Sequence, residues 1–307
     1  MKKTIITLFI AIVSFSSIYS QHDIGPALSS QLFSRINFNP AGIGNSDKIN
    51  IFNINRIQWA GFDGAPTYTL LNIHYFNEGL KSGFGGVFSY DKLGIANKAI
   101  NGKLAYCYGM DISEKAVLSL GASAGVLDMG NDFSSTSGHI FNPELGIPET
   151  VSKINPDFDF GVEFSTPSVL IGASINHLGY MSPATSLTAT QTYYGYIRGM
   201  LPVSNDISLA PSILYMNSGL TNVIDINVVS FFEKVYWAGL SLRPGAGFSA
   251  MIGLEWKSLR VGYSYEMSLG STTISSNTHE LMLSFVIPTD KKEAPTKGKG
   301  SKSKKKK

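Results

Sequence analysis

The sequence has little charge, a single cysteine and, beyond its first residues, no long apolar run. Charged residues make up 15% of the 307 residues, against roughly 25% in ordinary soluble domains. Something other than water is therefore expected to cover much of the surface. Because Cys107 has no second cysteine to pair with, an internal disulfide and a Cys-rich metal site are both excluded. We expect no redox chemistry.

The lack of long apolar runs excludes membrane-spanning helices in the mature chain. A helix needs about 20 apolar residues to cross a bilayer, and no such stretch follows the N-terminus. A β-barrel stays possible, because it spreads its apolar residues over alternate positions of short strands. The mean hydropathy of +0.07 is compatible with that arrangement.

The first 20 residues have the three parts of a secretory signal peptide. Lys2 and Lys3 form a basic start, residues 4–13 an apolar core, and residues 14–20 an exit rich in small residues. We predict cleavage after Ser20 and export of the mature chain. The alternative is a retained anchor helix, for which the apolar core is short.

Apolar and polar side chains alternate along most of the remaining chain. The clearest stretch, residues 157–165, alternates Phe158, Phe160, Val162 and Phe164 with Asp157, Asp159, Gly161 and Glu163. A strand with this pattern turns one face to lipid and the other to a polar interior. A turn at residues 166–168 and a second alternating run predict a hairpin.

The same pattern predicts an all-β fold, a transmembrane antiparallel β-barrel of about 14 strands, an even number that lets the barrel close. The predicted strands are residues 49–59, 67–75, 84–90, 103–108, 118–124, 157–165, 169–176, 192–201, 207–216, 223–232, 235–243, 248–256, 259–267 and 278–287. Short turns alternate with longer links, notably residues 128–156 and 178–190. Since outer-membrane barrels have short periplasmic turns, we expect the long links outside and both termini in the periplasm.

Aromatic residues favour a membrane barrel over a secreted β-sandwich or β-solenoid, which also alternate. We expect Tyr and Trp near strand ends or on outward positions, as in the aromatic girdles of membrane barrels. The residues concerned are Trp59, Tyr68, Tyr75, Tyr90, Tyr106, Tyr108, Tyr193, Tyr194, Tyr196, Trp237 and Trp256.

The chain therefore divides into a signal peptide (1–20), a periplasmic lead-in segment (21–47), an outer-membrane barrel (48–288) and a disordered tail (289–307). From Lys291 onward the tail has nine Lys and one Glu, with too little apolar surface to fold. Its role stays open: a solubilising end without a partner, or a contact with anionic lipid, peptidoglycan-linked acids or an acidic subunit.

The titratable residues do not indicate catalysis. The five histidines, His22, His74, His139, His177 and His279, are too far apart in the sequence for a metal-site or triad pattern. We expect no enzyme activity, no metal site, no cofactor and no nucleic-acid partner. A surface enzyme assembled from loops is the alternative.

Arg56 should point into the barrel, because a charge on the lipid face costs about 2 to 4 kcal/mol at the bilayer midplane. We favour an ordinary structural pair with Asp63 or Glu163. The alternative is an interior ion pair that holds a plug or a partner segment. For His279 and Glu280, we favour a hydrogen-bonding pair at a strand end over an acid and a base.

Several segments together resemble the PorP/SprF family of barrels, over roughly residues 31–287. In order, they are Asn39-Pro40-Ala41-Gly42; Arg56, Gln58, Trp59 and Gly61 before Gly64-Ala65-Pro66-Thr67; Gly83 and Gly85 with Asp91 and Gly94; Gly262-Tyr263-Ser264-Tyr265; and His279-Glu280. Glu266, where the family pattern has Asp, and the Lys-rich tail depart from that pattern.

The resemblance implies a non-enzymatic outer-membrane barrel of the type IX secretion system that supports export or surface attachment of specific cargo, such as gliding adhesins. It would contact outer-membrane lipid, periplasmic and surface secretion components and the secreted cargo protein. A barrel of this size is narrow for a folded protein, so we expect it to anchor partners and not to conduct cargo. The alternative is a porin or small-solute transporter.

Eleven residues of the matched motifs are candidates for docking a partner, although plain turn chemistry also explains the segments Asn39 to Gly42 and Gly61 to Pro66. The candidates are Asn39, Pro40, Gly42, Arg56, Gln58, Trp59, Gly64, Pro66, Asp91, His279 and Glu280.

Overall fold

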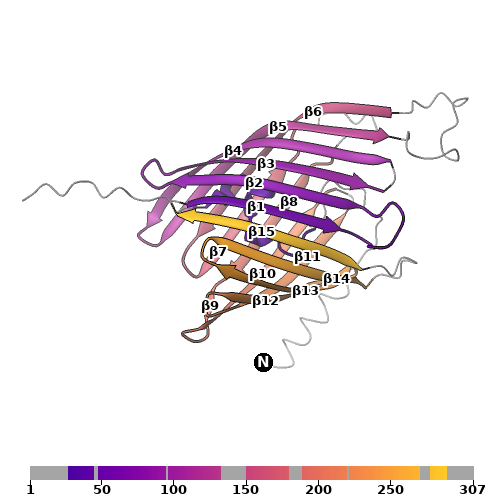
Figure 1. The fold of residues 1–307 in the computed structure, drawn as a ribbon. Helices are drawn as coiled ribbons and strands as arrows, with labels where there is room; N and C mark the ends of the chain where they lie inside the picture. The colour runs from indigo at the N-terminus through magenta and orange to yellow at the C-terminus, as the bar shows by residue number, and fades with distance from the viewer. Residues whose placement is uncertain are drawn as a thin grey trace, which may run out of the picture.

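The computed structural model describes residues 27–44, 48–94, 96–132, 150–179, 189–219, 221–269 and 277–288. Strands dominate these ranges (Figure 1), and none of their helices is long and apolar enough to cross a membrane. The predicted signal peptide and the Lys-rich tail lie outside the described residues.

Three short 3-10 helices precede fifteen strands. The helices are η1 (Gln31–Phe33), η2 (Arg35–Asn37) and η3 (Pro40–Ile43). The strands are β1 (Lys48–Ile57), β2 (Thr67–Asn77), β3 (Ser82–Leu93), β4 (Asn97–Ser113), β5 (Ala116–Asp132), β6 (Thr150–Ser165), β7 (Val169–Asn176), β8 (Thr192–Gly199), β9 (Leu201–Pro202), β10 (Ile207–Asn217), β11 (Asn222–Phe232), β12 (Tyr236–Arg243), β13 (Gly247–Trp256), β14 (Leu259–Ser268) and β15 (Thr278–Pro288).

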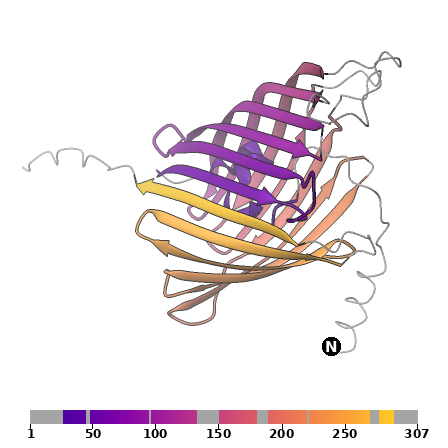
Figure 2. The same ribbon diagram turned by 45° about the vertical axis from the view of Figure 1, so that its right-hand side comes forward.

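The strands close into one antiparallel ring (Figure 2). Apart from β8 and β9, neighbours in sequence pair with each other, and β15 pairs with β1 from Lys48 opposite Pro288 to Ile57 opposite His279. Because β8 and β9 both pair with β10, they form one strand interrupted at Met200. The barrel therefore has 14 strands, which confirms the predicted fold class.

The two faces of the wall have the predicted chemistry. On β6, Phe158 and Phe160 are 41% and 55% exposed on the outside, whereas Asp157 and Glu163 are at most 2% exposed on the inside. The outer face can bury apolar side chains only in hydrocarbon, and the inner face must satisfy its charges within the barrel.

Connections of different length lie at opposite ends of the barrel. The short-turn end carries the connections 78–81, 114–115, 166–168, 203–206, 233–235 and 257–258, together with the first and last barrel residues. Tight turns there use positive φ angles, for example 50° at Glu233 and 55° at Lys234, which match the twist of the hairpin strands. The long-loop end carries the connections 133–149 and 177–191.

Four aromatic positions differ from the expected outward girdle. Tyr68 and Tyr194 face the interior clusters, Tyr194 with its ring 5.2 Å from that of Phe38. Trp256 is 61% exposed on the outside, as predicted, but Tyr196 and Trp237 point inward and are 4% and 3% exposed. Both rings pack against residues of the N-terminal segment, Trp237 against Phe33 and Tyr196 against Phe38. The prediction was wrong at these positions because the sequence gave no sign of apolar partners inside the barrel.

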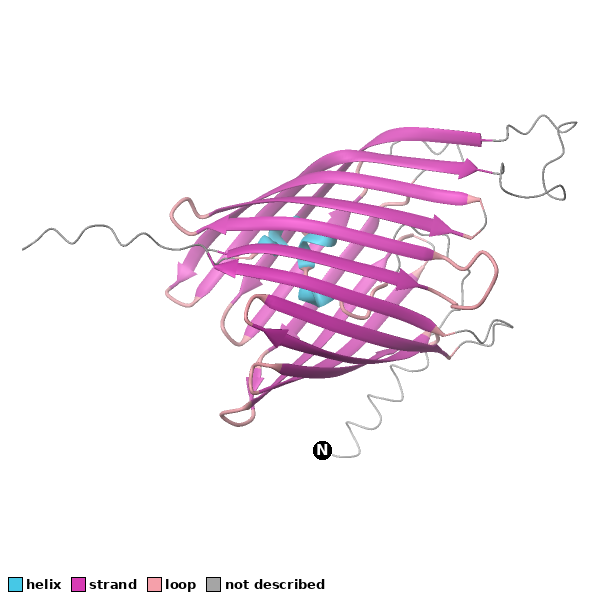
Figure 3. Ribbon diagram, viewed as in Figure 1, coloured by secondary structure: helices cyan, strands magenta, loops and turns pink. Residues whose placement is uncertain are grey.

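Those partners belong to residues 27–44, which lie inside the barrel and which we call the plug (Figure 3). We expected this part of the chain as a lead-in segment in the periplasm, and its position in the lumen corrects that expectation. Its apolar side chains explain the location: Leu28, Ile36, Phe38 and Ile43 are at most 4% exposed against inward-facing residues of the wall.

Candidate functional site

The plug runs along the barrel axis from the long-loop end toward the short-turn end. At its beginning, the backbone N–H of Ser29 donates to the carboxylate of Glu280, the third residue of β15. At its end, Ile43 packs beside Gly83, the second residue of β3, and the chain then continues into β1. Strand directions place these two contacts at opposite ends of the lumen.

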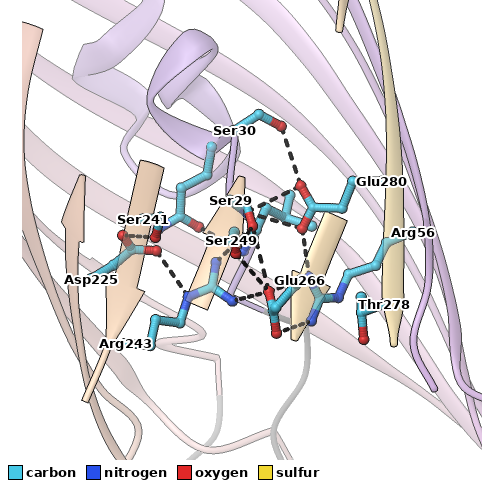
Figure 4. Close-up of polar contacts among 12 residues, drawn as sticks. Ser29, Ser30, Arg56, Asp225, Ser241, Arg243, Ser249, Glu266, Thr278 and Glu280 are labelled. Atoms are coloured by element: carbon cyan, nitrogen blue, oxygen red, sulfur yellow. Dashed lines mark hydrogen bonds and ion pairs between the residues drawn. The ribbon is translucent and has the colours of Figure 1, made fainter. Parts of the chain in front are cut away.

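A buried charged network lies near the beginning of the plug (Figure 4). It consists of Arg56, Asp225, Arg243, Glu266 and Glu280, each at most 9% exposed. The Nη1 atom of Arg56 is 2.6 Å from Glu280 Oε1 and 3.1 Å from Glu266 Oε2. Arg243 donates to Glu266 at 2.6 Å and to Asp225 at 2.9 Å. Two guanidinium groups thus hold three carboxylates, each pair joined by a charge-assisted hydrogen bond.

The charged network also binds the plug. The N–H of Ser29 lies 2.9 and 3.1 Å from the two carboxylate oxygens of Glu280, and Ser30 Oγ donates to the same carboxylate at 3.4 Å. The side-chain amide of Asn227 donates to the Ser29 carbonyl oxygen at 3.1 Å. The Glu280 carboxylate therefore accepts from Arg56 on the wall and from the backbone of the plug at Ser29.

Arg56 has other partners than we favoured. It does point inward, but it pairs with Glu266 and Glu280, not with Asp63 or Glu163. The interior pair that holds a plug, which was the alternative, describes its contacts. Glu266, noted in the sequence only as a departure from the family pattern, is the carboxylate shared by both arginines.

A second anchor joins the middle of the plug to β6. Arg35 forms a bidentate pair with Glu163 at 2.6 and 3.0 Å, and the hydroxyl of Tyr196 donates to the same carboxylate at 2.6 Å. The Glu163 carboxylate compensates the Arg35 charge inside the barrel through a charge-assisted hydrogen bond. Breaking such a buried pair on one side typically costs about 3 to 5 kcal/mol.

Asn39 sets the fold of the plug's last turn. Its Oδ1 accepts from the N–H of Ala41 at 2.9 Å and so caps η3, whose first residue is Pro40. Its Nδ2 donates to Tyr196 Oη at 2.9 Å, which connects the cap to the Arg35 anchor. At Gly42 a Cβ would lie 2.5 Å from the Cβ of Arg35, so only glycine fits there.

Glycines of the wall let the plug backbone approach closely. A Cβ on Gly121 would lie 2.7 Å from Ala41 Cα, and one on Gly161 would lie 2.8 Å from Asn39 Cγ. Two spaces beside the plug are small. One next to Asn37 has a volume of about 70 Å³ and one next to Phe33 about 10 Å³, and the second holds at most about one water molecule.

Phe33 makes aromatic and cation contacts between the plug and the wall. Its ring lies 4.7 Å from that of Trp237, and the guanidinium groups of Arg260 and Arg198 lie 5.3 and 6.0 Å from the ring centre. Phe33 therefore has guanidinium groups within reach of its ring, a contact that adds to its packing against Trp237.

Four other candidate residues lie in the β1–β2 connection at the long-loop end. There the N–H of Gln58 donates to the Pro66 carbonyl oxygen at 2.9 Å, and the N–H of Trp59 lies 3.3 Å from Thr278 Oγ1. Trp59 and Gly64 have positive φ angles of 54° and 78°, so the connection has a fixed turn shape. These residues do not contact the plug anchors through any hydrogen bond within the described ranges.

Asp91, His279 and Glu280 are also separated. Asp91 is buried on the inner face of β3. His279 points outward, where its Nδ1 lies 2.7 Å from Tyr263 Oη, whereas Glu280 points inward to Arg56. Adjacent residues on a strand face opposite sides, so the predicted hydrogen-bonding pair of His279 and Glu280 was wrong.

The structure thus joins Arg56 to Glu280 and places Asn39, Pro40 and Gly42 in the plug. Sequence reasoning missed Arg35, Asp225 and Arg243. The sequence did contain a signal for Asp225 and Arg243. Each is a charged residue at a strand position whose side chain points inward by alternation.

A closed antiparallel barrel with an apolar outer face and a charged, plugged interior defines the class of outer-membrane β-barrel proteins. The family model described as type IX secretion system membrane protein PorP/SprF matches residues 21–285. The chain belongs to this family, which confirms the resemblance in the sequence and supports a location in the outer membrane.

Solved structures of outer-membrane channels share the fold. A CymD monoaromatic hydrocarbon channel is 10% identical with a TM-score of 0.51, covering 89% of this chain and 95% of its own. The Pseudomonas putida toluene transporter TodX is 11% identical with a TM-score of 0.50, covering 89% and 95%. At such identities the likeness concerns the fold alone. Among curated proteins, none matches this chain.

Proposed function

We propose that this chain is a plugged outer-membrane scaffold of the type IX secretion system. It supports export or surface attachment of specific cargo, such as gliding adhesins, by anchoring partner proteins, and it does not conduct the cargo through its own lumen. Family membership supports the secretion role. The observation that carries the scaffold role is the plug, which is anchored to the wall through both ion-pair sites.

The contacts that anchor the plug oppose its withdrawal from the lumen. Withdrawing residues 27–44 would strip Glu163 of Arg35 and would remove the hydrogen bonds that Glu280 accepts from Ser29. Carboxylates left buried without partners are costly. A barrel whose lumen is held closed in this way can still present its two ends to other proteins.

The two ends suit two sets of partners. With the short-turn end in the periplasm, as in other outer-membrane barrels, the barrel's first and last residues face periplasmic secretion components. The β1–β2 connection then faces the cell surface, with Phe62 49% exposed at its tip and its turn fixed by the Gln58 to Pro66 hydrogen bond. We propose Gln58, Trp59, Gly64 and Pro66 as part of a surface that receives cargo or a surface partner.

Deletion and complementation test the secretion role. In a strain lacking the chain, cargo should accumulate in the periplasm and disappear from the surface, and the wild-type chain should restore it. Pull-down from detergent-solubilised outer membrane should recover other secretion components. If the deletion leaves cargo export and attachment intact, the scaffold function is refuted.

The second candidate function is a porin or small-solute transporter, and the shared fold with channel proteins is what favours it. A porin needs an open aqueous path, which the anchored plug opposes. Ion conductance of the purified protein separates the two.

A further inference from the structure

Three ligand-type side chains come together in the wall near the long-loop end. Asp157 and Asp159 lie on the inner face of β6, and His177 follows the last residue of β7. A carboxylate oxygen of each Asp and a ring nitrogen of His177 lie within 4.8 Å of one another, and all three residues are buried. The sequence spacing did not indicate this site, because β6 and β7 bring it together only after folding.

The site's geometry is fixed from two directions. The backbone N–H of His177 donates to Asp159 Oδ1 at 3.1 Å while its ring Nδ1 lies 3.0 Å from Asp157 Oδ2. His177 has a φ of 62°, a left-handed conformation that few non-glycine residues adopt. The imidazole is thus held against the carboxylates by its own backbone.

The two carboxylates of the site already have polar partners. Lys103 is the one ammonium among the described residues in contact with the site, at 2.8 Å from Asp157 Oδ2 and 2.7 Å from Asp159 Oδ1. Asn101 Nδ2 donates to Asp157 at 2.6 Å, and Ser123 Oγ donates to Asp159 at 2.6 Å. A divalent cation in place of the Lys103 ammonium would balance the two buried carboxylates.

A cavity beside the cluster contains an acceptor without a partner. Its volume is about 70 Å³, and Lys103, Asp159, Asn176 and His177 line it together with plug residues. Asn176 is 3% exposed, and its Oδ1 accepts no hydrogen bond within the described part of the chain. A buried oxygen of this kind requires a donor or a cation.

We propose that Asp157, Asp159 and His177 bind a first-row divalent cation such as Zn²⁺, with Asn176 Oδ1 as a further ligand. One imidazole with two carboxylates is a ligand set used for Zn²⁺, and the imidazole disfavours Mg²⁺ and Ca²⁺, which prefer oxygen ligands. The ion displaces the Lys103 ammonium from Asp157. Bound there, it ties β6 to the start of the β7–β8 connection beside the plug, a role separate from the proposed scaffold function.

The test is titration of the detergent-solubilised, exported full chain with Zn²⁺ by calorimetry, with Co²⁺ absorption as a second probe of ligand geometry. Wild type should bind one ion. Lys103→Met removes the competing ammonium and should tighten binding about tenfold or more, because even 1.4 kcal/mol corresponds to a factor of ten. His177→Asn keeps a residue that tolerates positive φ and should abolish binding.

His279→Asn is the matched control, since His279 is an outward-facing histidine near the same end of the barrel. It should bind Zn²⁺ like wild type. Heat-modifiable gel migration shows whether each variant is a folded barrel, and Asp159→Asn replaces His177→Asn if the latter does not fold. The proposal is overturned if neither wild type nor Lys103→Met binds Zn²⁺, if His279→Asn loses binding, or if Ca²⁺ binds as tightly as Zn²⁺.

Discussion

Arg56 and Glu280 face each other across neighbouring strands, and their side chains meet inside the barrel at 2.6 Å. This pair joins the first strand to the last and also carries the plug, because the Glu280 carboxylate accepts the Ser29 N–H. One cross-strand pair therefore links the first and last strands and also holds the segment that fills the barrel.

Replacing Arg56 should destabilise the whole barrel. Arg56→Met leaves Glu280 buried without a cation, whereas Glu266 keeps its pair with Arg243. We expect a loss of about 3 to 5 kcal/mol in unfolding free energy. Urea unfolding in detergent, followed by gel migration, measures it. The control Lys81→Met breaks the exposed pair with Asp111 and should leave stability nearly unchanged, because water screens an exposed pair. Equal losses in the two variants would contradict the buried role of Arg56.

Cys107 provides a reporter for the plug, since it is fully buried and packs with Ile36 and Ile43. In the folded wild type, a water-soluble maleimide should react with it slowly. Glu163→Gln weakens the Arg35 anchor and should raise the reaction rate about tenfold, which corresponds to about 1.4 kcal/mol of easier opening. Rapid labelling of the wild type, or no change in the variant, would show that the Arg35 anchor does not hold the plug over Cys107.

Gly121 should tolerate no side chain. A Cβ there lies 2.7 Å from Ala41 Cα, so we expect Gly121→Ala to cost about 1 to 3 kcal/mol by overpacking. Gly102 lies on the outer face of β4, where an added Cβ meets nothing within 4 Å, and Gly102→Ala is the matched control with little expected effect. The thermal unfolding midpoints of both variants test this expectation. A Gly121→Ala midpoint equal to that of the control would argue against close packing of the plug.

Orientation can be tested with single cysteines, because the buried Cys107 gives little background. Phe62 lies at the long-loop end and Leu80 at the short-turn end, and they are 49% and 65% exposed. On intact cells, a membrane-impermeant maleimide should label Phe62→Cys and not Leu80→Cys. The reverse pattern would place the β1–β2 connection in the periplasm and would exclude it as a surface for external cargo.

The wall of the barrel could be predicted from the sequence, and the plug could not. Alternation is a local signal, so residues such as Phe160 and Asp157 reveal their faces from their immediate neighbours. The inward direction of Arg56 followed from the cost of a charge in lipid. Its partner did not, because Glu280 is 224 residues away in the chain.

The plug was missed for a related reason. Residues 27–44 have no periodic pattern, and their anchors, such as Arg35 to Glu163, span 128 residues. The 3-10 turns at Asn39 and Pro40 were visible as turn chemistry, but turn chemistry does not tell whether a segment lies outside a barrel or within it.

Planar-bilayer conductance tests the central claim most directly. The purified wild-type protein should show no stable conductance steps, whereas a variant lacking residues 28–43, shown by gel migration to be a folded barrel, should conduct ions. Stable wild-type steps as large as those of the deletion variant would mean that the lumen is open, and would favour a porin over a plugged scaffold.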